Sequence, residues 1–171
     1  MNTTQAQAQA HTGVTYHCEL VRDGRVIDAW EAENLMPEEG RNYMLGVAIK
    51  AVAQLANWYL GVFENNAFPA DDLKASTAVA VLGETTTYVP STRPAFVGGT
   101  VAAGAVDNTA SRAEFTFNAA KRIYGAFMVS SPTKGSGAGV LISAARFGNY
   151  KDVESGDTLR VTASFNLISS T

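Results

Sequence analysis

The 171-residue sequence has few of the side chains on which catalysis and metal binding depend. It contains one cysteine, Cys18, so an internal disulfide is excluded, and with it a small secreted scaffold held together by disulfides. It contains two histidines, His11 and His17, whereas a zinc site needs about four cysteine, histidine or carboxylate ligands. The sequence therefore predicts neither a metal centre nor a cofactor.

Long apolar runs and an excess of basic residues are also missing. No stretch approaches the ~20 apolar residues of a membrane-spanning helix, and the polar start of the chain lacks the basic and apolar regions of a secretory signal. We expect a soluble protein, made in the cytoplasm, with no membrane partner. Sixteen acidic and 13 basic residues give a net charge of -3, so we expect no nucleic-acid partner either.

The residues that could support nucleophilic catalysis are poorly placed. A serine or cysteine nucleophile needs a neighbouring base, most often histidine. His17 and Cys18 are consecutive in a strand-like run, so their side chains should point to opposite faces. We assign no catalytic, cofactor-binding or metal-binding residue, and we expect the protein not to be an enzyme.

Two acidic clusters could hold calcium in principle. They are Asp71 with Asp72, and Asp152 with Glu154 and Asp157. Neither has the spacing of an EF-hand loop, and aspartate is common in turns. We interpret both clusters as solvated carboxylates of turns.

Two further patterns suggest chemistry but have a simpler interpretation. The stretch KGSGAG (134–139) has its lysine before the glycines and is followed by a strand-like run, so it predicts a flexible hairpin loop and not a phosphate-binding loop. Glu31 with Glu33, and Glu38 with Glu39, could form the carboxylate pair of a glycosidase only within a cleft. Surface charges are the simpler interpretation of these glutamates, and a cleft that contains one of the pairs is the alternative.

The apolar pattern predicts one domain that is mainly β. Residues 1–13 are rich in Gln, Ala and Thr and predict a flexible N-terminal arm, disordered in the free protein and ordered in an assembly, and residues 14–171 predict a single β-sandwich domain. Apolar residues alternate in 14–22 and strand-like sequence follows in 25–32. Between them, Asp23-Gly24 predicts a tight β-hairpin turn, in which both residues reach positive φ.

The remaining chain predicts one clear helix and six further strands. A helix should start at Pro37 and run to Ala51, because apolar residues recur there at helical spacing. Between 68 and 83 the pattern is ambiguous: Asp71 or Asp72 could cap a short helix ending at Val81, but Ser, Thr and Val disfavour it. Segment 84–94 predicts an extended surface stretch. The expected strands are 58–64, 95–101, 113–117, 123–129, 140–147 and 159–167. Of these, 123–129 is nearly all apolar and should be a central strand.

Five apolar residues of these strands should be largely buried, because each lies on the apolar phase of its strand. They are Phe115, Phe117, Phe127, Val161 and Phe165. About eight strands with one or two short helices predict an antiparallel β-sandwich of jelly-roll type.

The order of segments from Asn34 to Thr171 is more informative than any motif for chemistry. The segments are NLMPEEGRNYML, WYLGVF, PADDLKAS, GETTTYVPSTRPAF, DNTASRAEFTFNAAKRIYGAFMVSS, KGSGAG and VESGDTLRVTASFNLI. This order resembles a family of small virion structural proteins of tailed bacteriophages, of capsid-decoration (cement) type. The hairpin of residues 14–32 lies outside the resemblance.

The resemblance implies a non-enzymatic protein on the capsid surface of the virion, synthesised in the host cytoplasm. Its expected partners are the major capsid protein and further copies of itself, with a trimer as one option. The alternative is a tail, collar or fibre component, or a carbohydrate-binding β-module used in host attachment. For that alternative, Tyr88, Phe96 and Tyr150 are the loop aromatics that could stack on a sugar.

Overall fold

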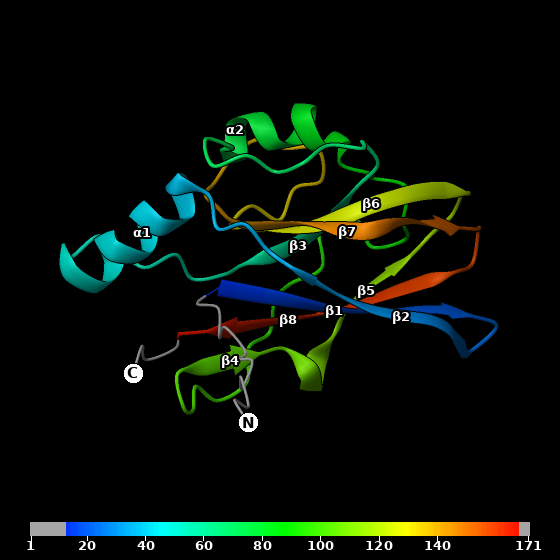
Figure 1. The fold of residues 1–171 in the computed structure, drawn as a ribbon, viewed down its shortest axis with the longest axis horizontal. Helices are drawn as coiled ribbons and strands as arrows, with labels where there is room; N and C mark the ends of the chain where they lie inside the picture. Colours follow the sequence, from blue (N-terminus) through cyan, green and yellow to red (C-terminus); the bar gives the residue numbers. More distant parts are fainter. Residues whose placement is uncertain (1–12, 168–171) are drawn as a thin grey trace, which may run out of the picture.

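The structure, a computed structural model, describes residues 13–167. Except for Gly13, the predicted N-terminal arm lies outside the described residues. Eight strands form two antiparallel sheets, and the predicted mainly β sandwich with two short helices is confirmed (Figure 1). The elements are β1 (Gly13–Arg22), β2 (Arg25–Glu33), α1 (Glu38–Ile49), β3 (Tyr59–Phe63), α2 (Ala75–Ala78), the π-helical turn η1 (Val79–Gly83), β4 (Ala105–Asp107), the 3-10 turn η2 (Thr109–Ser111), β5 (Ala113–Thr116), β6 (Lys121–Val129), β7 (Leu141–Val153) and β8 (Thr158–Asn166).

The two sheets differ in size and enclose the main core. The first has the order β2-β1-β8-β4, with β5 also paired to β8, and the second has the order β3-β6-β7. As predicted from its apolar run, β6 is the central strand of its sheet. Phe115, Phe117 and Val161 are buried, as expected, in the core between the sheets.

The N-terminal hairpin follows its sequence pattern closely. Asp23 and Gly24 have φ values of 49° and 74°, which allow the tight turn between β1 and β2. Cys18 is buried in the core while His17 is exposed, so the two side chains do lie on opposite faces of β1. Their arrangement as a catalytic pair is excluded by this geometry.

Residues 65–83 form a third layer over the outer face of the three-stranded sheet. Leu73, Ala78 and Leu82 pack there against Phe63 and Phe127, which makes a second apolar cluster. The segment is helical from Ala75 to Gly83, so the ambiguity in the sequence is resolved in favour of a helix. Neither aspartate caps it, since Lys74 is the N-cap residue.

Glu39 explains why weak helix formers become helical here. Its Oε2 atom accepts hydrogen bonds from the backbone N–H groups of Ala75 (2.9 Å) and Leu141 (2.7 Å). This one carboxylate therefore holds the start of α2 against the start of β7. A tertiary contact of this kind overrides the low helix propensity of Ser and Thr.

Several predicted details are wrong. Segment 84–94 is a surface stretch only in part, because Thr85, Tyr88 and Arg93 are buried while Val89 and the segment's other exposed residues face outward. No strand forms over 95–101, whose Gly98-Gly99 pair weakens strand pairing, and β4 and β5 pair with β8 instead.

Two smaller differences concern the ends of elements. Phe165 is only partly buried, because it lies at the end of β8, where the sandwich opens. The helix α1 ends at Ile49, and Ala51 has a positive φ of 56°, which a continuing helix does not allow. In the part of the chain that the structure describes, no helix combines the length and the apolar character needed to cross a membrane.

Candidate functional site

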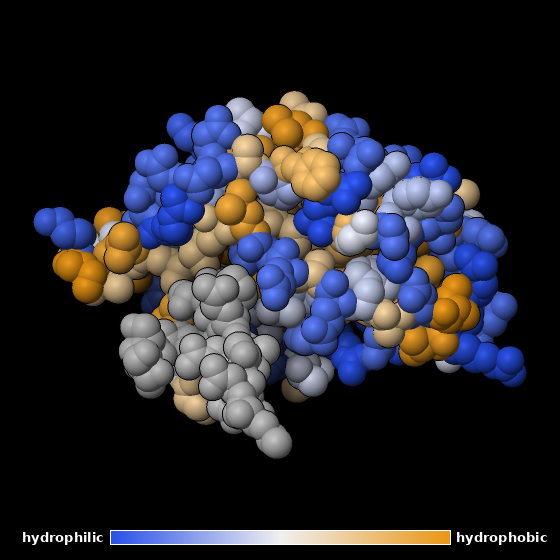
Figure 2. All heavy atoms as spheres, in the orientation of Figure 1, coloured by the Kyte–Doolittle hydropathy of each residue, from blue (hydrophilic) through white to orange (hydrophobic). Residues whose placement is uncertain are grey.

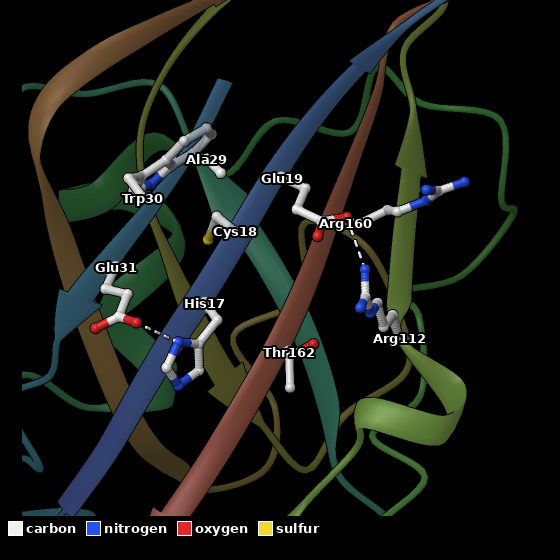
Figure 3. A pocket seen from close by; sticks show the side chains of 9 residues that line it. All are labelled: His17, Cys18, Glu19, Ala29, Trp30, Glu31, Arg112, Arg160 and Thr162. Carbon is white, nitrogen blue, oxygen red and sulfur yellow. Dashed lines mark hydrogen bonds and ion pairs between the residues drawn. The ribbon is translucent and has the colours of Figure 1, made fainter. Parts of the chain in front are cut away.

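A polar pocket lies on the outer face of the five-stranded sheet (Figure 3). It has a volume of about 270 Å³. Because side chains alternate along a strand, outward residues of β1, β2 and β8 meet at its rim. The pocket is lined by His17, Cys18, Glu19, Ala29, Trp30, Glu31, Arg112, Arg160 and Thr162.

The charged groups around this pocket compensate one another. The Nδ1 atom of His17 lies 2.9 Å from a carboxylate oxygen of Glu31, and Arg112 lies 2.6 Å from Glu19. Arg160 pairs with Glu114 at 2.9 Å. Exposed pairs of this kind contribute little to stability, and here each charged side chain at the rim already has a partner within the protein.

The one thiol near the pocket is not a nucleophile. Cys18 belongs to the core side of β1, and its burial raises the pKa of its thiol above the usual value. A thiol held protonated in this way does not attack a substrate. Among residues 13–167, no group of three or more His, Cys, Asp or Glu side chains is placed to bind a metal ion.

The acidic clusters seen in the sequence do not form a common site. Asp71 is exposed and pairs with Arg41 at 2.6 Å, and the hydrogen bond from that guanidinium lowers the pKa of Asp71. Asp157 is buried, so its interpretation as a solvated turn residue is wrong. It accepts hydrogen bonds from Arg22 at 2.8 and 2.7 Å, and these lower its pKa.

The loop 134–139 connects β6 to β7, but the rest of the protein ties it down. The Lys134 ammonium donates to the carbonyl oxygen of Tyr88 at 2.8 Å and lies 3.7 Å from the centre of that ring. Gly135 N–H donates to Glu84 at 2.8 Å. The connection between two strands was predicted correctly, and these contacts join its first residues to segment 84–94.

A buried ion pair, which the sequence analysis missed, fixes this region. Arg93 and Glu84 meet at 2.6 Å, with 1% and 0% of their side chains exposed. The Arg93 guanidinium also donates to the carbonyl oxygens of Ser131 and Ser136, both at 2.9 Å. The pair therefore fastens the long 84–94 segment to the β6–β7 connection. Its role is structural, since every polar group of the pair is satisfied within the fold.

A second, larger pocket is apolar and lies beside α1. It has a volume of about 490 Å³, and none of the described residues that line it is ionisable. The lining residues are Gly13, Met36, Met44, Gln54, Trp58, Phe96, Val101, Gly104, Ala105, Val106, Met128, Ile142, Phe165, Asn166 and Leu167. Methionine adapts its shape easily, so the three methionines suit a site that accommodates a partner.

Exposed aliphatic side chains also occur on α1, the helix that contributes Met44 to this pocket. Leu45 and Ile49, on α1, are 61% and 74% exposed, and Figure 2 shows apolar atoms gathered at the free end of that helix. Val101 and Leu167, at the pocket itself, are 73% and 59% exposed. We call the pocket together with Leu45 and Ile49 the apolar end surface.

The three aromatic residues proposed for sugar stacking are mostly occupied by contacts within the protein, and Tyr150 lies in β7 and not, as predicted, in a loop. Tyr88 is buried, and Phe96 packs edge-on against Phe165 with ring centres 5.9 Å apart. Tyr150 is exposed, but the Arg122 guanidinium lies 4.0 Å from its ring centre. The three residues do not form one platform.

Neither a known protein-family model nor a curated protein matches this chain. The structure itself defines an antiparallel β-sandwich. Pockets on its described surface include the polar pocket, the uncharged apolar pocket and a charged pocket lined by residues 120–122 and 152–154. Of these, the apolar pocket with its neighbouring exposed side chains is the better candidate for a functional site.

Proposed function

We propose that the protein is a non-enzymatic structural component of a tailed-bacteriophage virion, which decorates and stabilises the capsid shell by binding the major capsid protein. The apolar end surface carries this proposal. Large exposed apolar patches mark interaction sites, whereas single exposed apolar residues do not. The order of segments from Asn34 to Thr171 supports a virion partner.

The size of the surface fits a protein partner. A fully exposed aliphatic side chain offers ~60–120 Å², so four side chains that are well over half exposed offer roughly 150–350 Å². One side of an ordinary protein interface covers about 800 Å², of which ~57% is apolar. The exposed aliphatic side chains thus provide a substantial part of one interface, to which the pocket adds Trp58 and Phe96.

The lack of charged residues in the apolar end surface also suits self-association, which we include in the proposal. Two copies can meet through an uncharged surface without bringing like charges together. Gly13, which lines the pocket, is preceded by 12 residues that can span up to about 40 Å. We propose that this segment reaches a neighbouring subunit in the assembled particle.

The test is co-sedimentation with undecorated capsids of the phage that encodes the chain. Ile49→Asp should weaken the binding, because it places a charge in the apolar end surface. Ile27→Asp is the matched control, since Ile27 is also an exposed isoleucine, at 50% against 74% for Ile49, but lies in the β1–β2 hairpin. Failure of the unaltered protein to sediment with capsids would refute the capsid assignment, and its binding to isolated tails would favour the tail alternative.

A further inference from the structure

A row of arginine and aromatic side chains lies on the outer face of the three-stranded sheet. Residues 65–83 cover part of that face, and β6 and β7 extend beyond this cover (Figure 1). On β6, Arg122 and Tyr124 flank the buried Ile123, so both point outward. Arg146 and Tyr150 come from β7, and Phe68 comes from the loop after β3. We call these five outward residues the arginine–aromatic strip.

The five side chains lie next to one another in a continuous series. The Arg146 guanidinium carbon lies 4.4 Å from the ring centre of Phe68 and 5.9 Å from that of Tyr124. The rings of Tyr124 and Tyr150 are 5.8 Å apart, and the Arg122 guanidinium closes the series 4.0 Å from Tyr150. Stacking of this kind holds a guanidinium in a defined orientation before a partner arrives.

The two arginines differ in how their charge is compensated. Arg122 makes a two-pronged ion pair with Asp152, at 2.8 and 3.3 Å. Arg146 instead donates to the neutral side-chain oxygen of Asn66, at 3.1 and 2.5 Å, and to the carbonyl oxygen of Phe147. No carboxylate of the described residues forms an ion pair with Arg146. The strip therefore presents one oriented cation without its counter-charge.

We propose that the arginine–aromatic strip binds an acidic segment of a protein, with a carboxylate of that segment on Arg146 and its apolar parts against Phe68 and Tyr150. Arginine and tyrosine are the residue types that most often dominate the binding energy of protein interfaces. Phe68 is 75% exposed and has no core to fill, which fits a contact residue. This inference rests on the proposed function, because it assigns the acidic segment to a protein of the capsid shell.

A protein partner fits the strip better than a sugar. A sugar stacks on an open ring face, and here a guanidinium already lies over one face of Phe68 and one face of Tyr150. The strip also follows two neighbouring strands across an open sheet face. An extended acidic segment can follow such a row and meet several of its side chains at once.

The experiment is a binding titration against undecorated capsids with the full-length protein. Arg146→Ala should weaken the binding about tenfold or more, and Arg146→Glu should weaken it further, because a carboxylate partner is then repelled. Arg160→Ala is the matched control: Arg160 also lies on an outer sheet face, but its charge is compensated by Glu114. The difference between the unaltered protein and Arg146→Ala should shrink as salt is raised.

Each outcome decides a separate question. If the unaltered protein does not bind capsids, both the proposed function and this inference fail. If it binds and Arg146→Glu binds equally well, the strip is not the docking surface, while the proposed function stands. Should an Arg146 variant fail to fold, oxidative footprinting of the unaltered protein decides, because capsids must then protect Phe68 and Tyr150 from modification. Unchanged modification of both residues would overturn the proposal.

Discussion

Replacing Arg93 with alanine should lower the free energy of unfolding by about 3–5 kcal/mol, the usual cost of removing one partner from a buried ion pair. Arg93 makes two hydrogen bonds to Glu84, at 2.8 and 2.6 Å, and one each to the carbonyl oxygens of Ser131 and Ser136. With 1% and 0% of the two side chains exposed, water does not replace these bonds while the fold stays intact.

The magnitude follows from the groups that the substitution leaves behind. The Glu84 carboxylate keeps one hydrogen bond, from Gly135 N–H at 2.8 Å, and loses both bonds from the guanidinium. The carbonyl groups of Ser131, which is buried, and Ser136, which is partly buried, lose a donor as well, at about 1–3 kcal/mol for a fully buried group. These costs are not additive, because one local opening of the fold lets water reach all of the unpaired groups. The total loss in free energy of unfolding therefore stays near the range for a broken buried pair.

The assay is equilibrium unfolding in urea at neutral pH, followed by the fluorescence of Trp30 and Trp58. Arg160→Ala serves as control, because it breaks an exposed pair and should cost at most about 1 kcal/mol. The double variant Glu84→Gln with Arg93→Met should cost less than the sum of its single variants, as expected for groups in direct contact. A loss below about 1 kcal/mol for Arg93→Ala would refute the assigned role of the pair.

Three further predictions concern the core and the acid stability. In urea titrations, Phe115→Ala should cost about 3–5 kcal/mol, whereas Phe165→Ala should cost less because Phe165 is partly exposed; equal costs would contradict this. Gly61→Ala should lower the melting temperature, because the added Cβ atom would lie 2.2 Å from the ring of Phe127; an unchanged melting temperature would show that the ring moves freely. The pKa of Asp157 is lowered in the folded state, so its stabilising effect is present above the unfolded pKa of about 3.9 and is lost as the pH falls through the folded pKa. Over a pH range of about 5 to 2, which includes the unfolded pKa, the free energy of unfolding should therefore fall less steeply for Asp157→Asn than for the unaltered protein. Parallel curves would contradict the role of the Arg22 pair.

Much of the fold was predictable because its signals are local. Alternation of apolar residues identified β1, β5 and β8, a nearly continuous apolar run identified β6, and Asp23-Gly24 marked the hairpin turn. Such patterns depend only on the direction in which neighbouring side chains point, so the sequence reveals them directly.

The candidate surfaces were far less predictable. The apolar pocket brings Met44 of α1 together with Met128 of β6 and Phe165 of β8, and no spacing in the sequence links these residues. The same holds for the arginine–aromatic strip, where Phe68 meets Arg146 from a distant part of the chain. The one available signal was the number of apolar residues outside the predicted strands.

The sequence by itself determined a mainly β chain, the hairpin, the helix after Pro37 and the central position of β6. Only the tertiary structure decided that segment 84–94 buries Thr85, Tyr88 and Arg93, that residues 65–83 become a helical cover, and that Arg146 stands without a counter-charge. The physical reason is that the contacts involved join residues far apart in the sequence. A charged side chain is buried only where other groups satisfy its hydrogen bonds. For Arg93 these groups include the carbonyl oxygens of Ser131 and Ser136, which lie 38 and 43 residues away, so no local pattern reveals them.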